Sequence, residues 1–260
     1  MVEILYTAGK RNKKATLPEN YNELSRRQVI AISRLFLVGY PPDVAQLEAL
    51  RILLNRSLIG LYRIPLQAKS AMLEHVDWVF ARNGLTRQFL PRYRRFYGPA
   101  GEWDNLTMGE WSNCEVYYEW MVNDRDENAI NYLIAVLYRR RKKQYPVKLD
   151  PDGDLRVPYN HHETAYWAAK ISRWPIAVKM GILNWYDGCR EYVINSYDVF
   201  EPGTTEEEKK APGMMEVIRG MCGATYGSFD QVEKMNVHKA LREMEILKQE
   251  AAKLKADLKK

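Results

Sequence analysis

The chain has 260 residues, 46% of them hydrophobic, so it can bury a substantial core, and its three scattered cysteines predict neither disulfides nor a Cys-x-x-Cys metal site. The net charge of +6 comes from 39 Lys and Arg against 33 Asp and Glu, a mixed surface that permits acidic partners without requiring them. No apolar run reaches the roughly 18 residues of a membrane span and the first residues lack an apolar export signal, which predicts a soluble, cytoplasmic protein that is not exported.

The first elements predicted are a hairpin and a capped helix. In residues 1–17, VEILYT and ATL flank the basic, turn-like GKRNKK, which favours a short hairpin. Ser25 can cap a helix that ends at Gly39 and carries Phe36 on its buried side.

Helical periodicity dominates the following residues. Helices are predicted at 42–62, 65–83, 107–122, 128–141 and 162–200, the last interrupted at Pro175. Phe80 is expected on the buried side of the second of these. Pro and Gly at 85–105 predict an irregular, basic connector. The expected class is all-α, with a bundle-like helical body in residues 1–200.

A linker at 201–213, EPGTTEEEKKAPG, separates this body from a predicted C-terminal arm at 214–260. Near its end, apolar residues recur alternately three and four apart, as in a coiled-coil seam. The seam consists of Val237, Ala240, Met244, Leu247, Ala251, Leu254 and Leu258. It predicts an amphipathic helix that binds a protein partner or a second copy of itself. Packing of the same stripe onto its own body is the alternative.

No catalytic or metal-binding constellation stands out in the sequence. His161 and His162 are adjacent and would point about 100° apart on a helix, whereas a helical zinc pair needs one turn of spacing. Asp150, Asp152 and Asp154 alternate like a calcium loop, but Gly153 falls at the fourth position of such a loop rather than the sixth. We therefore expect no enzyme, no metal and no cofactor.

Two stretches combine basic and aromatic residues. PRYRRFYG contains Arg92, Arg94 and Arg95, and YRRRKKQY contains Arg139, Arg140, Arg141, Lys142 and Lys143. Such residues neutralise phosphates and stack on bases, so nucleic-acid binding is one interpretation. A favourable interaction of the second stretch with the carboxyl end of a helix is the other.

Three segments together resemble small tail-assembly proteins of bacteriophages, in particular those of Bacteroidetes phages and prophages. They are LPENYNELSRRQVIAIS, with its Pro, aromatic, Glu-Leu-Ser opening; LTMGEWSNCEVYYEWMVNDRDENAINYLIAVLYRRRKK, where an acidic turn precedes a Leu-Ile-Ala-x-Leu-Tyr-Arg helix; and FDQVEKMNVHKALREMEILKQEAAKLK, which is similar to their C-terminal helix. The resemblance implies a helical, non-enzymatic factor that keeps a long tape-measure protein soluble while the tail assembles.

The leading hypothesis is accordingly a tail-assembly chaperone or morphogenesis factor that binds a tape-measure or tail subunit through its final helix. Two alternatives remain open at this point. One is a structural virion subunit, such as a tail or connector component, that associates with itself and is located in the virion. The other is a nucleic-acid-binding phage factor that uses the two basic stretches.

Overall fold

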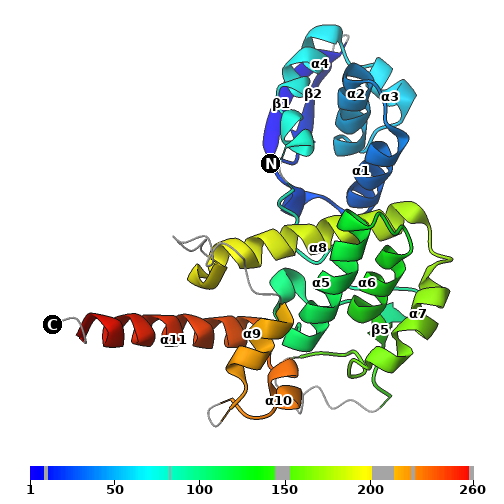
Figure 1. Ribbon diagram of the computed structural model, residues 1–260. Helices are drawn as coiled ribbons and strands as arrows, with labels where there is room; N and C mark the ends of the chain where they lie inside the picture. Colours follow the sequence, from blue (N-terminus) through cyan, green and yellow to red (C-terminus); the bar gives the residue numbers. More distant parts are fainter. Residues whose placement is uncertain (9–10, 82, 144–152, 201–213, 224–225, 258–260) are drawn as a thin grey trace. The chain divides into compact units, whose positions relative to one another are not determined.

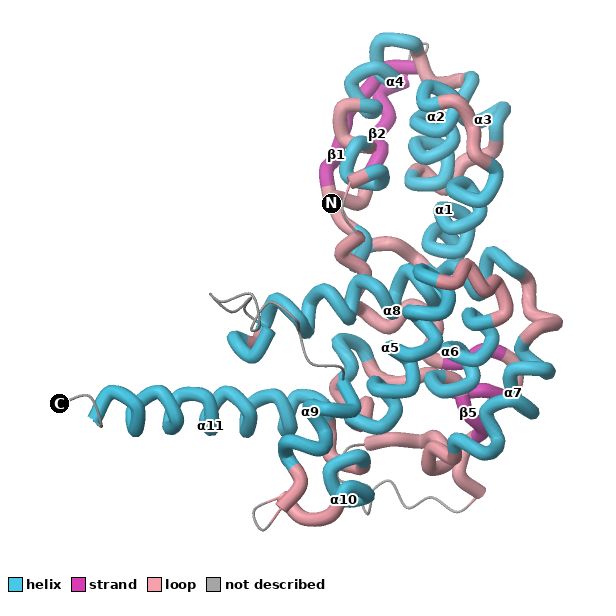
Figure 2. Tube along the Cα trace, in the orientation of Figure 1, coloured by secondary structure: helices cyan, strands magenta, loops and turns pink. Residues whose placement is uncertain are grey.

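The computed structural model describes residues 1–8, 11–81, 83–143, 153–200, 214–223 and 226–257 (Figure 1). The described chain is mostly helical with a two-stranded sheet near its N-terminus, which confirms the predicted helical class (Figure 2). Within these residues no helix has both the length and the apolar character needed to cross a membrane.

Packing divides the chain into two units, which are described separately. The first consists of Met1–Leu90 and Trp174–Cys189, and the second of Pro91–Arg173 and Arg190–Lys260. The expected division into a body at 1–200 and an arm at 214–260 stays a prediction, and the linker at 201–213 lies outside the described residues.

The first unit begins with an antiparallel hairpin, in which Val2 pairs with Leu17 and Ala8 with Arg11. Its strands are β1 (Val2–Ala8) and β2 (Arg11–Leu17), so most of the predicted basic turn belongs to the second strand. The helices are η1 (Tyr21–Glu23), α1 (Arg26–Val38), α2 (Pro42–Leu53), α3 (Leu58–Tyr62), α4 (Leu66–Leu73), η2 (Asp77–Phe80) and most of α8 (Ile176–Ser196).

Local sequence explains where these helices begin and end. Ser25 and Gln28 form a complete capping box at the start of α1, and Gly39 ends the helix in the left-handed region at φ +66°. The predicted helix at 42–62 is wrong as one element. It breaks at Asn55, which has a φ of +52°, and restarts where the Ser57 hydroxyl accepts a hydrogen bond from the Gly60 N–H.

The core of the first unit contains residues from every part of its chain. Leu17, Leu24, Ile32, Leu50, Met72, Leu85 and Trp185 are each fully buried. Phe36 and Phe80, which were expected in this core, are instead 47% and 40% exposed. Both side chains line a surface groove described below.

The second unit is built around two helices that pack together, α5 (Met108–Asn123) and α6 (Ala129–Leu137). Thr107 and Glu110 form a capping box at the start of α5, and every residue of α6 except Tyr132 is buried. The remaining elements are β3 (Arg92–Tyr93), β4 (Phe96–Tyr97), η3 (Gly101–Trp103), β5 (Arg139–Arg140), η5 (His161–Glu163), α7 (Thr164–Ile171), the end of α8, η6 (Asp198–Phe200), α9 (Met214–Met221), α10 (Phe229–Glu233) and α11 (Val237–Asp257).

A three-stranded antiparallel sheet in the second unit was not predicted from the sequence. Its order is β3-β4-β5, with Tyr93 opposite Phe96 and Phe96 opposite Arg140. Each strand has only two residues. Strands this short carry no measurable alternation, so pattern analysis could not detect them.

Candidate functional site

A cluster of four charged side chains lies in the second unit, three of them buried and one, Asp154, 18% exposed. Glu110 of α5 accepts hydrogen bonds from Nη2 of both Arg139 and Arg156, the latter at 3.0 Å. Asp154 accepts from Arg156 Nε at 2.9 Å and lies 3.6 Å from Arg139 Nη2. Glu110, Arg139 and Arg156 side chains are at most 6% exposed. Two carboxylates therefore neutralise two guanidiniums away from water.

The same arginines also satisfy the end of helix α6. Arg139 Nη1 donates to the carbonyl of Val136 at 2.7 Å, and Arg156 Nη1 donates to that of Leu137 at 2.9 Å. Free carbonyls at a helix end need such partners. The predicted role of Arg139 in nucleic-acid binding is therefore wrong, because its charge is used inside the fold.

Electrostatics within the cluster differ between the two arginines. Burial, together with the nearby Arg156, lowers the pKa of Arg139 below its ordinary value. Burial opposes the charge of Arg156 as well, but Glu110 and Asp154 outweigh this effect and raise the pKa of Arg156.

A hollow of about 790 Å³ opens beside the cluster. Since all three guanidinium nitrogens of each arginine already bond to protein oxygens, the cluster is structural rather than a preformed anion site.

Helix α11 is anchored to the second unit by its first turns. The Val237 N–H donates to Leu106 at 2.9 Å, and the Asn236 side-chain amide donates to the Asp104 carbonyl at 2.6 Å. His238 Nε2 lies 2.7 Å from the Glu102 carbonyl, and its Nδ1 lies 2.8 Å from the Tyr197 hydroxyl. A carbonyl only accepts, so Nε2 carries a proton, and in the neutral imidazole Nδ1 then accepts from the Tyr197 hydroxyl.

Further along α11 the predicted seam passes from buried to exposed. Val237 and Ala240 are fully buried, Met244 is half-buried, and Leu247 and Leu254 are 41% and 65% exposed. Ala251 is also exposed, and Leu258 lies outside the described residues. The predicted seam does not include Leu241, which follows Ala240 and is fully buried. We name Met244, Leu247, Ala251 and Leu254 the distal seam.

The two basic stretches meet in the three-stranded sheet. Arg92, Arg94, Arg95, Arg140, Arg141 and Lys143 are exposed, whereas Lys142 is partly buried and donates to the Asp154 carbonyl at 2.9 Å. The Arg140 guanidinium lies 5.9 Å from the ring centroid of Trp167 in α7. Phe96 and Arg140, about 45 positions apart in the sequence, are thus neighbours in the sheet. The sequence of neither stretch predicts this pairing.

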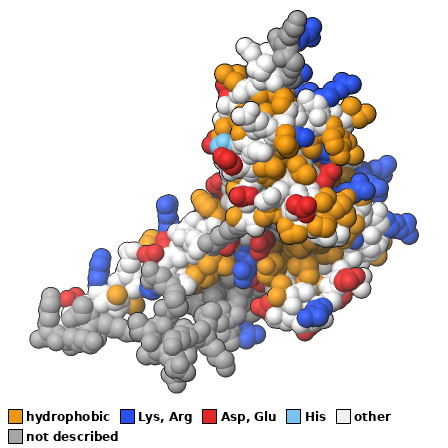
Figure 3. Space-filling model, turned by 90° about the horizontal axis from the view of Figure 1, so that it is seen from above, with side chains coloured by type: hydrophobic (Ala, Val, Ile, Leu, Met, Phe, Trp, Pro, Cys, Tyr) orange, Lys and Arg blue, Asp and Glu red, His pale blue; other side chains and the backbone are white. Residues whose placement is uncertain are grey.

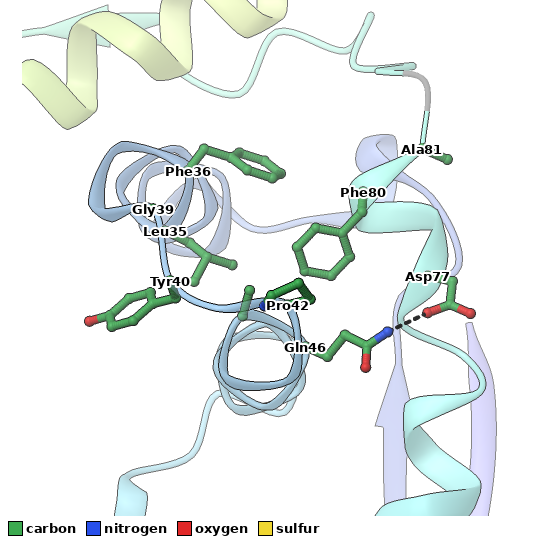
Figure 4. A pocket seen from close by; sticks show the side chains of 10 residues that line it. Leu35, Phe36, Gly39, Tyr40, Pro42, Gln46, Asp77, Phe80 and Ala81 are labelled. Atoms are coloured by element: carbon green, nitrogen blue, oxygen red, sulfur yellow. Dashed lines mark hydrogen bonds between the residues drawn. The ribbon is translucent and has the colours of Figure 1, made fainter.

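An apolar groove of about 670 Å³ lies in the first unit, between the end of α1, the start of α2 and η2. Phe36 and Phe80 meet edge to face at one side of it, with centroids 5.9 Å apart at 88°, and Tyr40 lies at its other side (Figure 4). Gln46 donates to Asp77 at 3.2 Å and makes one polar edge. Apolar side chains also reach the surface elsewhere (Figure 3).

Reactive side chains gather nowhere in the part of the chain that the structure describes. No three His, Cys, Asp or Glu residues come close enough there to hold a metal ion. The ring centroids of His161 and His162 lie 3.7 Å apart with the rings tilted by 41°, and burial raises the pKa of the Cys114 thiol well above its usual value. Asp150 and Asp152 of the calcium-like pattern lie outside the described residues.

Comparisons with known protein families, with curated proteins and with solved structures found no match for the chain.

Proposed function

We propose that this protein is a non-enzymatic assembly factor that binds a helical segment of a partner protein through the distal seam of α11. The resemblance to phage tail-assembly proteins favours a tape-measure or tail subunit as that partner. One observation carries the proposal: a single apolar stripe is buried where α11 begins and exposed where it continues.

A stripe divided in this way suits a docking element. The buried residues fix the helix to its own unit, so the exposed residues are presented on a helix that is already formed. A partner helix would then not have to provide the free energy of folding α11. Leu247 and Leu254 are seven residues apart, or roughly 10.5 Å along a helix, which matches one heptad of a coiled-coil partner.

The expected strength is that of a reversible complex. Burying a whole leucine side chain contributes about 1.5–3 kcal/mol, so covering the 41% and 65% exposed parts of Leu247 and Leu254 would contribute about 0.6–1.2 and about 1–2 kcal/mol respectively. Met244 adds to this from its half-buried position. The groove lined by Phe36 and Phe80 is a second apolar surface of the kind that binds proteins, and it also supports a binding function.

The test compares three forms of the full chain as baits in lysate of the source cells. They are the unchanged protein, the Leu247→Asp/Leu254→Asp variant, and the Gln249→Asp/Ala252→Asp variant. The last adds the same two charges to exposed positions on the opposite side of α11. Circular dichroism should show equal helix content in all three.

The expected result is recovery of a long protein with heptad repeats by the unchanged and control baits only. Losing about 1.6–3.2 kcal/mol corresponds to at least about a 15-fold weaker Kd. Equal recovery by all three baits would refute the assignment of the seam, and so would equal loss by both variants. If light scattering instead shows self-association that the seam variant lacks, the structural virion subunit becomes the better hypothesis.

A further inference from the structure

The strongest unassigned surface lies on the three-stranded sheet of the second unit. Residues opposite each other in an antiparallel ladder share a face, so Tyr93, Phe96 and Arg140 lie on the same side of the sheet. Trp167 of α7 packs edge-on against Phe96 there, with centroids 5.6 Å apart at 84°. We name Tyr93, Arg94, Arg140, Tyr166, Trp167 and Lys170 the basic–aromatic face.

Cations and rings alternate across this face. The Arg94 guanidinium lies 5.7 Å from the Tyr93 ring centroid and that of Arg140 lies 5.9 Å from Trp167. Lys170 Nζ lies 5.2 Å from the ring of Tyr166. Arg94, Arg140 and Lys170 are exposed, and Tyr166 is 58% exposed. Positive charge and π surface are thus both accessible to one ligand.

The charge of this face is not neutralised within the described chain. Among the described residues, the ion pairs do not involve Arg94, Arg140 or Lys170. One carboxylate lies close by, that of Glu163, which accepts a hydrogen bond from Trp167 Nε1 at 2.9 Å. Arg92, Arg95 and Arg141 are exposed next to these residues along the same strands and turn, so the region remains strongly positive.

We propose that the basic–aromatic face binds single-stranded nucleic acid. Arginines supply contacts to phosphates, and accessible tyrosine and tryptophan rings supply stacking surfaces for bases. Bases stack on a protein ring only when they are free of a duplex, so the exposed ring of Tyr166 favours a single strand. This binding is independent of the distal seam of α11.

The predicted salt dependence follows from the number of cations. If about four of them contact phosphates, log K should fall against log salt with a slope near −3, because each contact contributes about −0.7 on a single strand. Neutralising three of the contacts should then reduce the slope to about −1 and weaken binding at low salt by roughly 10- to 100-fold.

The experiment measures fluorescence anisotropy of labelled oligo(dT), oligo(U) and a mixed duplex, each of about 20 units, which exceeds the ~4–16 nucleotides of a typical site. The test variant is Arg94→Gln/Arg140→Gln/Lys170→Gln, which neutralises the three cations of the face. The control, Arg11→Gln/Arg27→Gln/Arg63→Gln, removes the same charge from exposed arginines of the first unit. Arg139 is left unchanged because it is buried in the fold.

We expect salt-sensitive binding to one or both single strands, weaker binding to duplex, and loss only in the test variant. Tyr166→Ala should weaken binding at least about 5-fold with little change in slope, since it removes stacking and no charge. Binding to oligo(dT) alone would indicate DNA and binding to oligo(U) alone RNA.

Several results would overturn the proposal. They are absence of binding at low salt, preference for the duplex, equal losses in the test and control variants, or equally tight binding of polyglutamate. The last result would show a general polyanion surface rather than one that recognises bases.

Discussion

Replacing Glu110 by glutamine should strongly destabilise the second unit. The carboxylate is 2% exposed and neutralises two guanidiniums that are themselves at most 6% exposed. Glutamine keeps the shape of the side chain and its place in the capping box, but it removes the negative charge and turns an amide N–H₂ toward N–H donors. Breaking a buried ion pair from one side costs about 3–5 kcal/mol, because the remaining charge stays buried.

Denaturant unfolding followed by circular dichroism measures this loss, and thermal unfolding should show a midpoint lower by roughly 6–20 °C. Glu48→Gln is the matched control. Its partner Arg51 lies 2.7 Å away, but both side chains are partly exposed, so a loss below about 1 kcal/mol is expected. If Glu110→Gln costs no more than Glu48→Gln, the cluster does not hold the fold together in the way argued.

Two further predictions concern the first unit. The Tyr21 hydroxyl donates to the Val79 carbonyl at 2.6 Å and burial raises its pKa to about 12, above the 10.0 of a free tyrosine. The protonated Tyr21 hydroxyl therefore stabilises the fold fully below about pH 10, and this stabilisation is lost as the pH rises toward 12. The free energy of unfolding of the unchanged protein should fall by about 2–3 kcal/mol over that range because of Tyr21, and the Tyr21→Phe variant should lack this part of the fall. Unfolding curves measured from pH 10 to 12 test this, and the same pH profile in both proteins would contradict it. At Gly188, an added Cβ would lie 2.5 Å from the backbone oxygen of Leu85, so Gly188→Ala should cost about 1–3 kcal/mol, whereas Gly220→Ala, with open space, should be neutral or stabilising. Equal melting temperatures for the two alanine variants would refute the packing argument.

Sequence analysis succeeded where the determinants of structure are local. The capping boxes at Ser25 and Thr107 depend on residues three positions away, and each marks the start of a helix correctly. The break of the helix at Asn55 was not predicted, because no local signal in the sequence marks it. Leucines at helical spacing continue through it, so the period alone did not show that the backbone leaves the helical region there.

The role of Arg139 shows what the sequence could not provide. In YRRRKK it is one of five adjacent basic residues, and nothing local separates it from Arg140. The separation comes from β5, in which neighbouring side chains point to opposite faces, so that Arg139 turns inward and Arg140 outward. The inward charge is tolerated only because Glu110, 29 positions earlier, lies opposite it. In the sequence, the only indication of a role for Glu110 is its place as the third residue of a helix capped by Thr107.

The predicted seam of α11 has an analogous division, and it determines which substitutions can report on function. Val237 and Ala240 are fully buried, so a polar residue there should unfold the second unit whether or not a partner binds. Leu247 and Leu254 are exposed, so aspartate at those positions should leave the fold intact and affect only what the helix contacts outside it. A truncation that removes all of α11 cannot distinguish these effects, because it also removes Leu241 from the core. Binding must therefore be tested with point substitutions in the distal seam.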